Sequence, residues 1–260
     1  MSLLRVENLT MRFGGLLAVD KVCFTAQPSA ITSIIGPNGA GKTTLFNCLT
    51  GFYPPTSGQI ILRHSDASFA LEVMPRAAIP RKARLARTFQ NIRLFAGMTV
   101  LENLIIAASA RKSHFLQDFL NTPNARRHRE QAIEKALGWL DFFGLRHVAN
   151  IAAGSLSYGQ QRKIEIARAL CTDPVLLCLD EPAAGLNAAE SAELMHQLAG
   201  LTRQRGIALL LIEHDMSVVM SISDHIIVLE YGKKIAEGDA AHIRHHPEVI
   251  RAYLGEDDEE

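Results

Sequence analysis

The residues best suited to chemistry form a glycine-rich loop that closes with a lysine and a threonine. Its sequence, GPNGAGKT, follows an apolar strand candidate at Ile31–Ile35 and opens a helix candidate, the context that a phosphate-binding loop requires. Glycines let backbone N–H groups turn toward phosphate oxygens, and the helix N-terminus adds its positive dipole. An ordinary glycine turn rarely matches this spacing by chance. We therefore predict a nucleotide phosphate site, with Lys42 on the β- and γ-phosphates and Thr43 on Mg²⁺, made of Gly36, Pro37, Asn38, Gly39, Ala40, Gly41, Lys42, Thr43 and Thr44.

A pair of carboxylates follows a second apolar strand candidate. Residues 175–179 read VLLCL, and Asp180 and Glu181 come directly after them. Because ligands bind at the carboxyl ends of parallel strands, both carboxylates fit the edge of the sheet that carries the phosphate loop. Taken alone, the pair fits a surface acidic cluster equally well. Beside the phosphate loop, we predict that Asp180 holds Mg²⁺ through water and that Glu181 polarises the attacking water.

Alternating strands and helices are expected to position these groups. Strand candidates at Ile31–Ile35, 175–179, 207–212 and 225–230 are separated by helical segments. This alternation predicts a mostly parallel sheet with helices on both faces. Further strands, expected around residues 19–24 and 59–63, indicate an antiparallel region near the N-terminus.

The middle of the chain has helical signals. Thr99 with Glu102, and Ser157 with Gln160, have capping-box spacing. Thr122 with Pro123 suits the start of a helix that ends before Gly144. We therefore expect an α-helical subdomain at about residues 91–171, inserted into an α/β core formed by residues 1–90 and 172–260. A further helix, running to about residue 204, is expected to be capped by Asn187 and Glu190.

Composition and charge restrict the class of protein. The 260 residues are 48% hydrophobic and 21% charged, and 27 basic residues balance 27 acidic ones. A neutral chain has no overall field that attracts nucleic acid or an anionic membrane surface. The N-terminus has no signal-peptide pattern, and no apolar run reaches membrane-spanning length. We expect a cytoplasmic protein with buried, reduced cysteines, which needs another polypeptide to act across a membrane.

Three other features have simpler interpretations than the functions they suggest. A solvated or subunit-facing surface explains one basic stretch better than nucleic-acid binding does. This stretch contains Arg81, Lys82, Arg84, Arg87 and Arg93. His242, His245 and His246 lack the other ligands of a metal site, so we expect a surface helix there. Trp139 and its apolar neighbours are expected in the core of the helical subdomain, and residues 256–260 in a solvated acidic tail.

Four further segments, together with the two above, resemble the motifs of ABC ATPases in order and spacing. They are the signature segment LSYGQ at 156–160, Gln90 after TF, the segment AGLN at 184–187, and His214 after the next strand. One such motif is weak evidence, but six in this order are specific. The resemblance covers essentially the whole chain and implies one ABC ATPase domain over residues 1–260, with a P-loop NTPase core.

The resemblance also implies roles for residues outside the phosphate loop. Two such domains should pair head to tail, so that each ATP touches the phosphate loop of one and the signature segment of the other, where Ser157, Gly159 and Gln160 lie. His214 would contact the γ-phosphate, and Gln90 would touch Mg²⁺ and report the nucleotide state to the helical subdomain. Phe13 would stack on adenine, although a core position is also compatible with its neighbours.

Two residues depart from the common pattern of the family. Tyr158 stands where many members have glycine, and Asn187 stands where many have aspartate. Neither change removes a group assigned to the chemistry, and Asn187 can still cap the helix that follows.

The chain is more specifically similar to the longer ATPase subunit of branched-chain amino acid importers. The similarity lies in MRFGGLLAV, FNCLTGFYPPTSG, ARTFQNIRLF, EPAAGLN, LIEHDMSVVMSISD, VIRAYLGE and the insert FLQDFLNTPNARRHRE. This family implies a second ATPase subunit, two membrane subunits and a periplasmic binding protein. Relatives in urea or amide uptake and in lipopolysaccharide export share much of the pattern, so these remain alternatives.

Two other classes of ABC protein are less compatible with the sequence. Soluble members in DNA repair or translation usually have a second cassette or a long coiled coil, and neither is found here. A non-catalytic regulatory cassette usually lacks one of the catalytic groups, whereas Lys42, Asp180, Glu181 and His214 are all in place.

Overall fold

The chain folds into two compact units. The computed structural model describes residues 2–110 and 123–254. The first unit contains residues 1–87, Val175–Ala183 and 195–260, and the second contains Thr88–Pro174 and Ala184–Leu194. The second unit therefore includes a few more residues at each end than the helical subdomain expected from the sequence. It also includes a segment that follows the two carboxylates.

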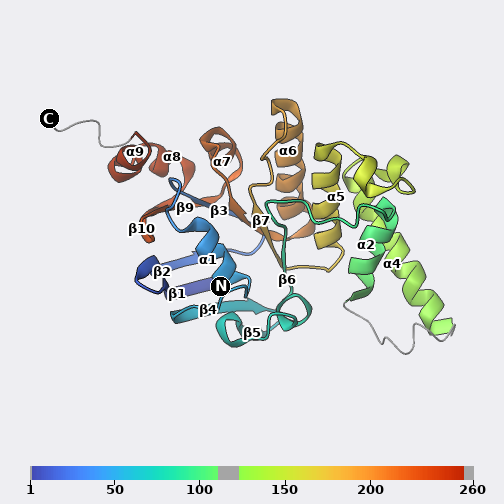
Figure 1. The fold of residues 1–260 in the computed structure, drawn as a ribbon, viewed down its shortest axis with the longest axis horizontal. Helices are drawn as coiled ribbons and strands as arrows, with labels where there is room; N and C mark the ends of the chain where they lie inside the picture. Colours follow the sequence, from blue (N-terminus) through green and yellow to red (C-terminus); the bar gives the residue numbers. More distant parts are fainter. Residues whose placement is uncertain (1, 111–122, 255–260) are drawn as a thin grey trace. The chain divides into compact units, whose positions relative to one another are not determined.

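The N-terminal region of the first unit is an antiparallel sheet of four strands (Figure 1). Its strands are β1 (Leu4–Phe13), β2 (Leu16–Ala26), β4 (Ser57–His64) and β5 (Ala67–Ala70), in the order β2-β1-β4-β5. Burial alternates along β1 and β2, as expected of strands with one face on the core. The antiparallel region predicted from the sequence is thereby confirmed.

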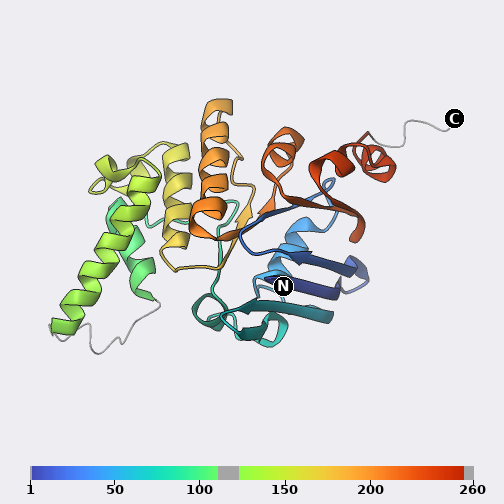
Figure 2. The same ribbon diagram turned by 180° about the vertical axis from the view of Figure 1, so that it is seen from behind.

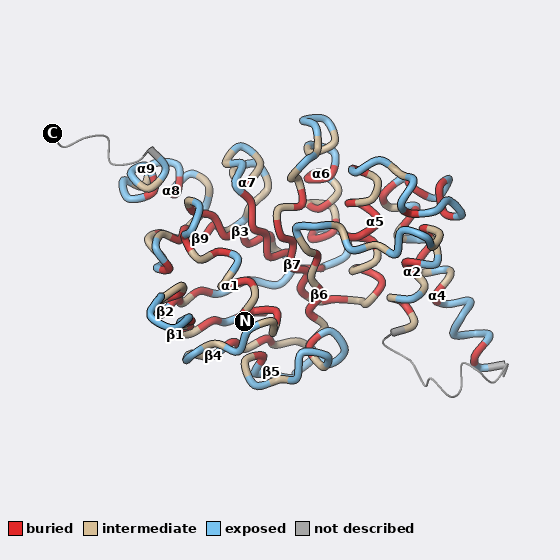
Figure 3. Tube along the Cα trace, viewed as in Figure 1, coloured by how far each residue is buried: buried red, intermediate tan, exposed pale blue. Residues whose placement is uncertain are grey.

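A six-stranded sheet forms the centre of the first unit. It contains β3 (Ile31–Ile35), β6 (Leu85–Arg87), β7 (Leu176–Asp180), β8 (Ala208–Ile212), β9 (His225–Glu230) and β10 (Lys233–Gly238), in the order β10-β9-β3-β8-β7-β6. All pairs are parallel except β9 with β10. Every residue of β3, β7 and β8 is buried, and Figure 3 shows β3 and β7 as buried segments. Continuous apolar strands of this kind belong to a sheet covered on both faces.

The sheet order brings the predicted chemistry to one edge. Strand β8 lies between β3 and β7, so the three carboxyl ends are neighbours. The phosphate loop follows β3 and leads into α1 (Lys42–Leu49), and the two carboxylates end or follow β7. His214 follows β8, before α7 (Met216–Ile222). The helices α8 (Ala240–Arg244) and α9 (Pro247–Leu254) come after the last strand, where the sequence indicated only a surface helix.

The helices α2 (Val100–Ala110), α4 (Pro123–Phe142) and α5 (Tyr158–Leu170) of the second unit pack against one another (Figure 2). Both predicted capping boxes are present: Thr99 Oγ1 accepts from the Glu102 N–H at 3.2 Å, and Ser157 Oγ accepts from the Gln160 N–H at 3.3 Å. Thr122, part of the predicted insert and residues 256–260 lie outside the described residues. The described residues also form short 3₁₀ turns at Leu71–Val73, Arg146–Val148 and Ala153–Ser155 and a π-turn at Ile79–Ala83.

The helix α6 (Ala188–Arg205) starts at the cap predicted for it. Asn187 Oδ1 accepts from the Glu190 N–H at 2.9 Å, and Glu190 Oε2 accepts from the Asn187 N–H at 3.1 Å. Asparagine at this departure from the family pattern thus fulfils the capping role expected of it.

Some expectations about burial are corrected by the structure. Cys48, Cys171 and Cys178 are buried free thiols, but Cys23 is only half-buried. Trp139 is also half-buried, whereas Leu140 and Phe143 next to it are in the core. Within the described ranges, no helix combines the length and the apolar character needed to span a membrane.

Candidate functional site

The phosphate loop lines a cavity of about 430 Å³ in the first unit. Glu181, from the end of β7, lines the same cavity as Lys42 and Thr43. The structure thus brings together the cation, the hydroxyl and the carboxylate that the sequence selected separately. The remaining lining residues are Leu16, Leu17, Ala18, Asn38, Gly39, Ala40, Gly41, Thr44, Tyr231 and Gly232.

Two glycines of the loop are required by close backbone contacts. A Cβ at Gly36 would lie 2.1 Å from the carbonyl oxygen of Leu229, and a Cβ at Gly41 would lie 2.4 Å from that of Ala18. Both residues also have positive φ angles, 148° and 95°, which favour glycine. Side chains at these positions would push the loop away from the strands that hold it.

The N-terminus of α1 opens into the loop without a side-chain cap. Gly41 occupies the cap position and provides no side-chain hydrogen bond, so the N–H groups of the first helical turn are suited to an anion. Thr43 and Thr44, both in this first turn, line the cavity. Backbone donors, hydroxyl groups and the helix dipole therefore converge there.

Lys42 is held over the loop by two backbone carbonyls. Its Nζ donates to Gly36 O at 2.6 Å and to Pro37 O at 2.9 Å. Burial lowers the pKa of Lys42 below its usual value, and the charge of Glu181 acts in the opposite direction. Both side chains line the cavity described above.

Asp180 ends β7 and is held by a buried ion pair. Arg87 Nη2 donates to Asp180 Oδ2 at 2.9 Å, and both side chains are 8% exposed. Arg87 Nη1 also donates to Asn47 Oδ1 at 2.6 Å and to Thr50 Oγ1 at 2.8 Å, both on or after α1. The guanidinium therefore joins the helix of the phosphate loop to the carboxylate predicted to hold Mg²⁺.

The position of Arg87 corrects the sequence analysis. We assigned it to a solvated or subunit-facing basic stretch, and Arg81 and Lys82 of that stretch are indeed exposed. Arg87, in contrast, lies on β6, beside β7 in the sheet. Its partner Asp180 is far away in sequence, so only the pairing of the two strands reveals the contact.

Glu181 adopts a backbone conformation that is uncommon outside glycine. Its φ angle is 47°, and its N–H donates to Ile212 O at the end of β8 at 2.9 Å. Non-glycine residues with positive φ are often found at functional sites.

A second buried carboxylate, missed by the sequence analysis, precedes His214. Glu213 is 0% exposed, and its oxygens accept from the Ala183 N–H at 2.9 Å and the His214 N–H at 3.3 Å. Burial raises the pKa of Glu213, and these hydrogen bonds partly oppose the effect. The His214 side chain is 63% exposed, with Nδ1 3.7 Å from Glu213.

The donor set fits a nucleotide with its magnesium ion. The loop offers N–H groups, an ammonium and two hydroxyls to phosphate oxygens, and Asp180 and Thr43 offer the oxygen ligands that Mg²⁺ prefers. Phe13, predicted to stack on adenine, is 42% exposed, and its ring packs edge-on against Tyr53 with centroids 5.5 Å apart. Leu16, Leu17 and the exposed Tyr231 are the large hydrophobic side chains that line the cavity itself.

The remaining predicted residues lie in the second unit. Ser157 caps α5, and Gln160 completes its capping box through Oε1, which accepts from the Ser157 N–H at 3.2 Å. A Cβ at Gly159 would lie 2.9 Å from Glu190 Oε1, so a side chain there would displace the Glu190 carboxylate. Gln90 is exposed, and its backbone carbonyl accepts from Arg162 Nη2 at 2.7 Å.

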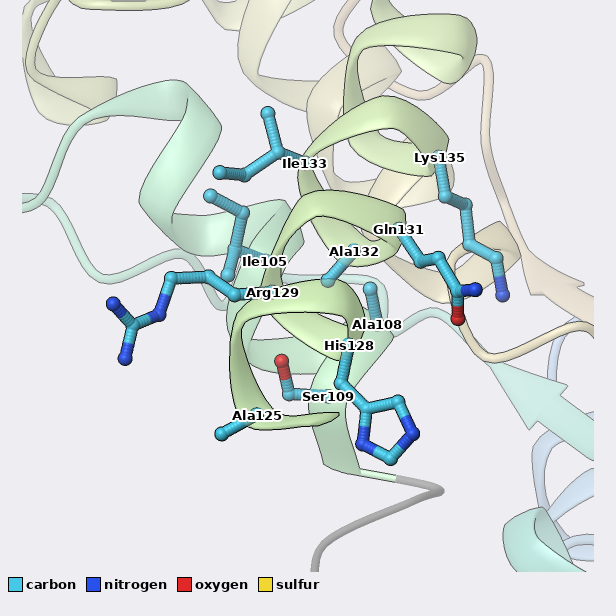
Figure 4. A pocket seen from close by; sticks show the side chains of 10 residues that line it. All are labelled: Ile105, Ala108, Ser109, Ala125, His128, Arg129, Gln131, Ala132, Ile133 and Lys135. Atoms are coloured by element: carbon cyan, nitrogen blue, oxygen red, sulfur yellow. The ribbon is translucent and has the colours of Figure 1, made fainter. Parts of the chain in front are cut away.

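Another cavity, between α2 and α4, contains none of the predicted residues. Figure 4 shows its lining side chains, among them His128, Arg129 and Lys135 from α4 and Ile105 from α2. No pattern of catalytic or metal-ligating groups is present among them, so we assign this cavity no role.

Comparisons with known proteins agree with this geometry. The sequence matches the family described as ABC transporter over residues 19–184. It also matches the family described as branched-chain amino acid ATP-binding cassette transporter over residues 233–259. The first match covers the phosphate loop, the signature segment and both carboxylates.

Similar proteins cover nearly the full chain. The high-affinity branched-chain amino acid transport ATP-binding proteins BraF of Pseudomonas aeruginosa and LivG of Escherichia coli (strain K12) are 50% and 51% identical over 255 residues, 98% of each chain. The solved ADP conformation of MJ1267, an ATP-binding cassette of an ABC transporter, is 33% identical, with a TM-score of 0.83 over 98% of this chain and 100% of that one. The chain therefore belongs to the ABC transporter family, in its group of branched-chain amino acid transport ATP-binding proteins.

Proposed function

We propose that this chain hydrolyses ATP in the presence of Mg²⁺ and thereby powers an importer of branched-chain amino acids. The observation that carries the proposal is that Lys42, Thr43 and Glu181 line the same cavity. The identity of about half of all residues to BraF and LivG supports the choice of substrate.

Each predicted site residue near the phosphate loop has a part in the proposed reaction. The loop N–H groups and Lys42 bind the β- and γ-phosphates, while Thr43 and Asp180 would hold Mg²⁺, Asp180 through water. The metal supplies charge neutralisation on the phosphate oxygens. Glu181 accepts a proton from water as the water oxygen bonds to the γ-phosphorus. The bond from that phosphorus to the bridging oxygen then breaks, and ADP and phosphate are the products.

The signature-segment residues of the second unit act on a partner's nucleotide in this proposal. Two ATPase subunits, the same or paralogous, pair head to tail, and Ser157, Gly159 and Gln160 of one approach the γ-phosphate bound by the other. Ser157 contributes its hydroxyl and the N-terminus of α5 contributes amides and dipole. Outside the signature segment, Gln90 would touch Mg²⁺, while His214 contacts the γ-phosphate and Phe13 stacks on adenine.

The assembly that we propose contains two membrane-spanning subunits, and a periplasmic binding protein delivers the substrate. The ATPase subunits lie at the cytoplasmic face of the inner membrane as peripheral proteins. ATP binding closes the ATPase dimer, and hydrolysis reopens it.

The role of Glu181 is tested by replacing it with glutamine. Since general-base catalysis contributes about 10²- to 10⁴-fold, Glu181→Gln should lower turnover by at least about 100-fold while ATP affinity changes little. Glu237→Gln, at a 42% exposed side chain on β10 that pairs with Lys234, is the matched control and should hydrolyse ATP normally. Hydrolysis at the wild-type rate by Glu181→Gln would refute the assignment.

The substrate is tested in liposomes containing the complete complex and its binding protein. ATPase stimulation by leucine, isoleucine and valine, without stimulation by urea, is the expected result. Stimulation by urea alone would retain the ATPase and reject the branched-chain substrate.

A further inference from the structure

A fully buried arginine holds the Gln90 segment from the side of α5. Arg162 is 0% exposed, and its Nη1 and Nη2 donate to the backbone carbonyls of Phe89 and Gln90, each at 2.7 Å. A guanidinium has a planar, rigid set of donors, so two such bonds fix the direction of the backbone they hold. Arg162 is one helical turn beyond Tyr158, the residue that departs from the family pattern.

Glu165 extends the same contact along the segment. Its Oε2 accepts from Arg162 Nη1 at 3.0 Å, and its Oε1 accepts from the Arg93 N–H at 3.1 Å. Both side chains of this ion pair are nearly inaccessible, at 0% and 2% exposure. The pair on α5 therefore binds the backbone of residues 89–93 at both ends, with the charge of each partner compensated inside the protein.

Tyr158 completes this arrangement at the beginning of the signature helix. Its hydroxyl oxygen accepts from Arg162 Nη2 at 3.1 Å. Its ring lies against Gly185, where a Cβ would be 3.1 Å from Tyr158 Cε1. The side chain thus touches the arginine that holds Gln90 and the segment that follows the catalytic carboxylates, whereas a glycine at this position would make neither contact.

We propose that Tyr158 and Arg162 are positioning residues that fix the backbone of Gln90 relative to the first turn of the signature helix. The shared donor group of Arg162 Nη2 joins the two, because it binds Tyr158 and Gln90 at once. This inference rests on the proposed function, in which Gln90 contacts Mg²⁺ and Ser157, next to Tyr158, serves the partner's nucleotide. This role explains why tyrosine replaces the common glycine at position 158: its hydroxyl holds the Gln90 backbone and the first turn of the signature helix in one geometry.

The first test removes only the hydroxyl group. Tyr158→Phe, in the full-length chain assembled with its membrane subunits, should lower kcat for ATP hydrolysis by about threefold to tenfold, the effect expected when one ordinary hydrogen bond is lost. KM for ATP should change less than about twofold, since the phosphate loop that binds ATP lies in the first unit. A general loss of structure would lower the amount of active protein and the unfolding temperature instead.

The second test asks whether Tyr158 acts through Gln90. If it does, Tyr158→Phe combined with Gln90→Ala should be no slower than Gln90→Ala alone, because the group being positioned is already absent. Arg162→Lys, which retains the charge and loses the planar donor set, should resemble Tyr158→Phe or be slower. If Arg162→Lys fails to fold, the two other variants still decide the question.

The matched control is Arg146→Gln, which breaks an exposed ion pair in the same unit, with side chains 58% and 48% exposed. It should leave kcat and KM unchanged. Wild-type kcat in Tyr158→Phe, or effects of Tyr158→Phe and Gln90→Ala that multiply, would overturn the proposal. Failure of the motor assignment would be distinguishable, because Glu181→Gln would then retain hydrolysis whatever Tyr158→Phe does.

Discussion

Replacing Arg87 with methionine should destabilise the protein by about 3–5 kcal/mol, the usual cost of removing one partner from a buried ion pair. This loss of stability lies in the upper part of the range caused by single substitutions. Asp180 would remain, 8% exposed, without the guanidinium at 2.9 Å. Asn47 and Thr50 would each lose a donor at 2.6 and 2.8 Å. Methionine is chosen because it retains much of the apolar stem of arginine, so the lost charge dominates the effect.

Thermal unfolding followed by circular dichroism measures the change. For a chain of this size, 1 kcal/mol corresponds to about 2–4 °C in Tm, so the expected decrease is about 6–20 °C. Unfolding in urea provides an independent measurement, in which the midpoint should fall. The control, Arg146→Met, breaks an ion pair whose side chains are 58% and 48% exposed. Surface pairs contribute about 0–1 kcal/mol, so its Tm should stay within about 4 °C of wild type.

A second substitution separates the buried charge from lost packing. In Arg87→Met combined with Asp180→Asn, no uncompensated carboxylate remains, and the double variant should be more stable than Arg87→Met alone. A Tm for Arg87→Met equal to that of Arg146→Met would refute the reasoning. So would a double variant less stable than the single one, because the penalty would then come from packing rather than charge.

Two further predictions concern the loop and the carboxylate before His214. Gly41→Ala should lower ATP affinity at least about tenfold because the new Cβ would meet the Ala18 carbonyl at 2.4 Å; in contrast, Gly138→Ala, with nothing within 4 Å of the new Cβ, should stabilise α4 by about 0.5–1 kcal/mol. Equal ATP affinity in the two variants, measured by equilibrium titration, would contradict this. Burial raises the pKa of Glu213 above 4.5, so its carboxyl group binds a proton more tightly in the native state than in the unfolded state. The free energy of unfolding contributed by Glu213 therefore falls as pH rises from 4.5 through the raised pKa. Glu213→Gln should remove this pH-dependent loss of stability, so the Tm of the variant minus the Tm of the wild type should increase with pH. A Tm difference that stays constant between pH 4.5 and 8 would contradict the prediction.

The features that the sequence predicted well depend on short-range chemistry. The phosphate loop needs glycines at fixed spacing, and a Cβ at Gly36 or Gly41 would collide with a backbone oxygen. The capping boxes at Ser157 and Asn187 join residues three positions apart. Such interactions are encoded within one helical turn or one loop, so a single sequence is enough to recognise them.

The features that the sequence missed depend on contacts between distant segments. Arg87 appeared to belong to a solvated basic stretch because its partner, Asp180, lies on another strand. Arg162 and Glu165 resemble ordinary surface residues of an amphipathic helix, yet both are buried against residues 89–93. A charged residue with charged neighbours in sequence looks the same whether it is exposed or buried against a partner from a distant segment. Only the three-dimensional pairing distinguishes a buried charge from an exposed one.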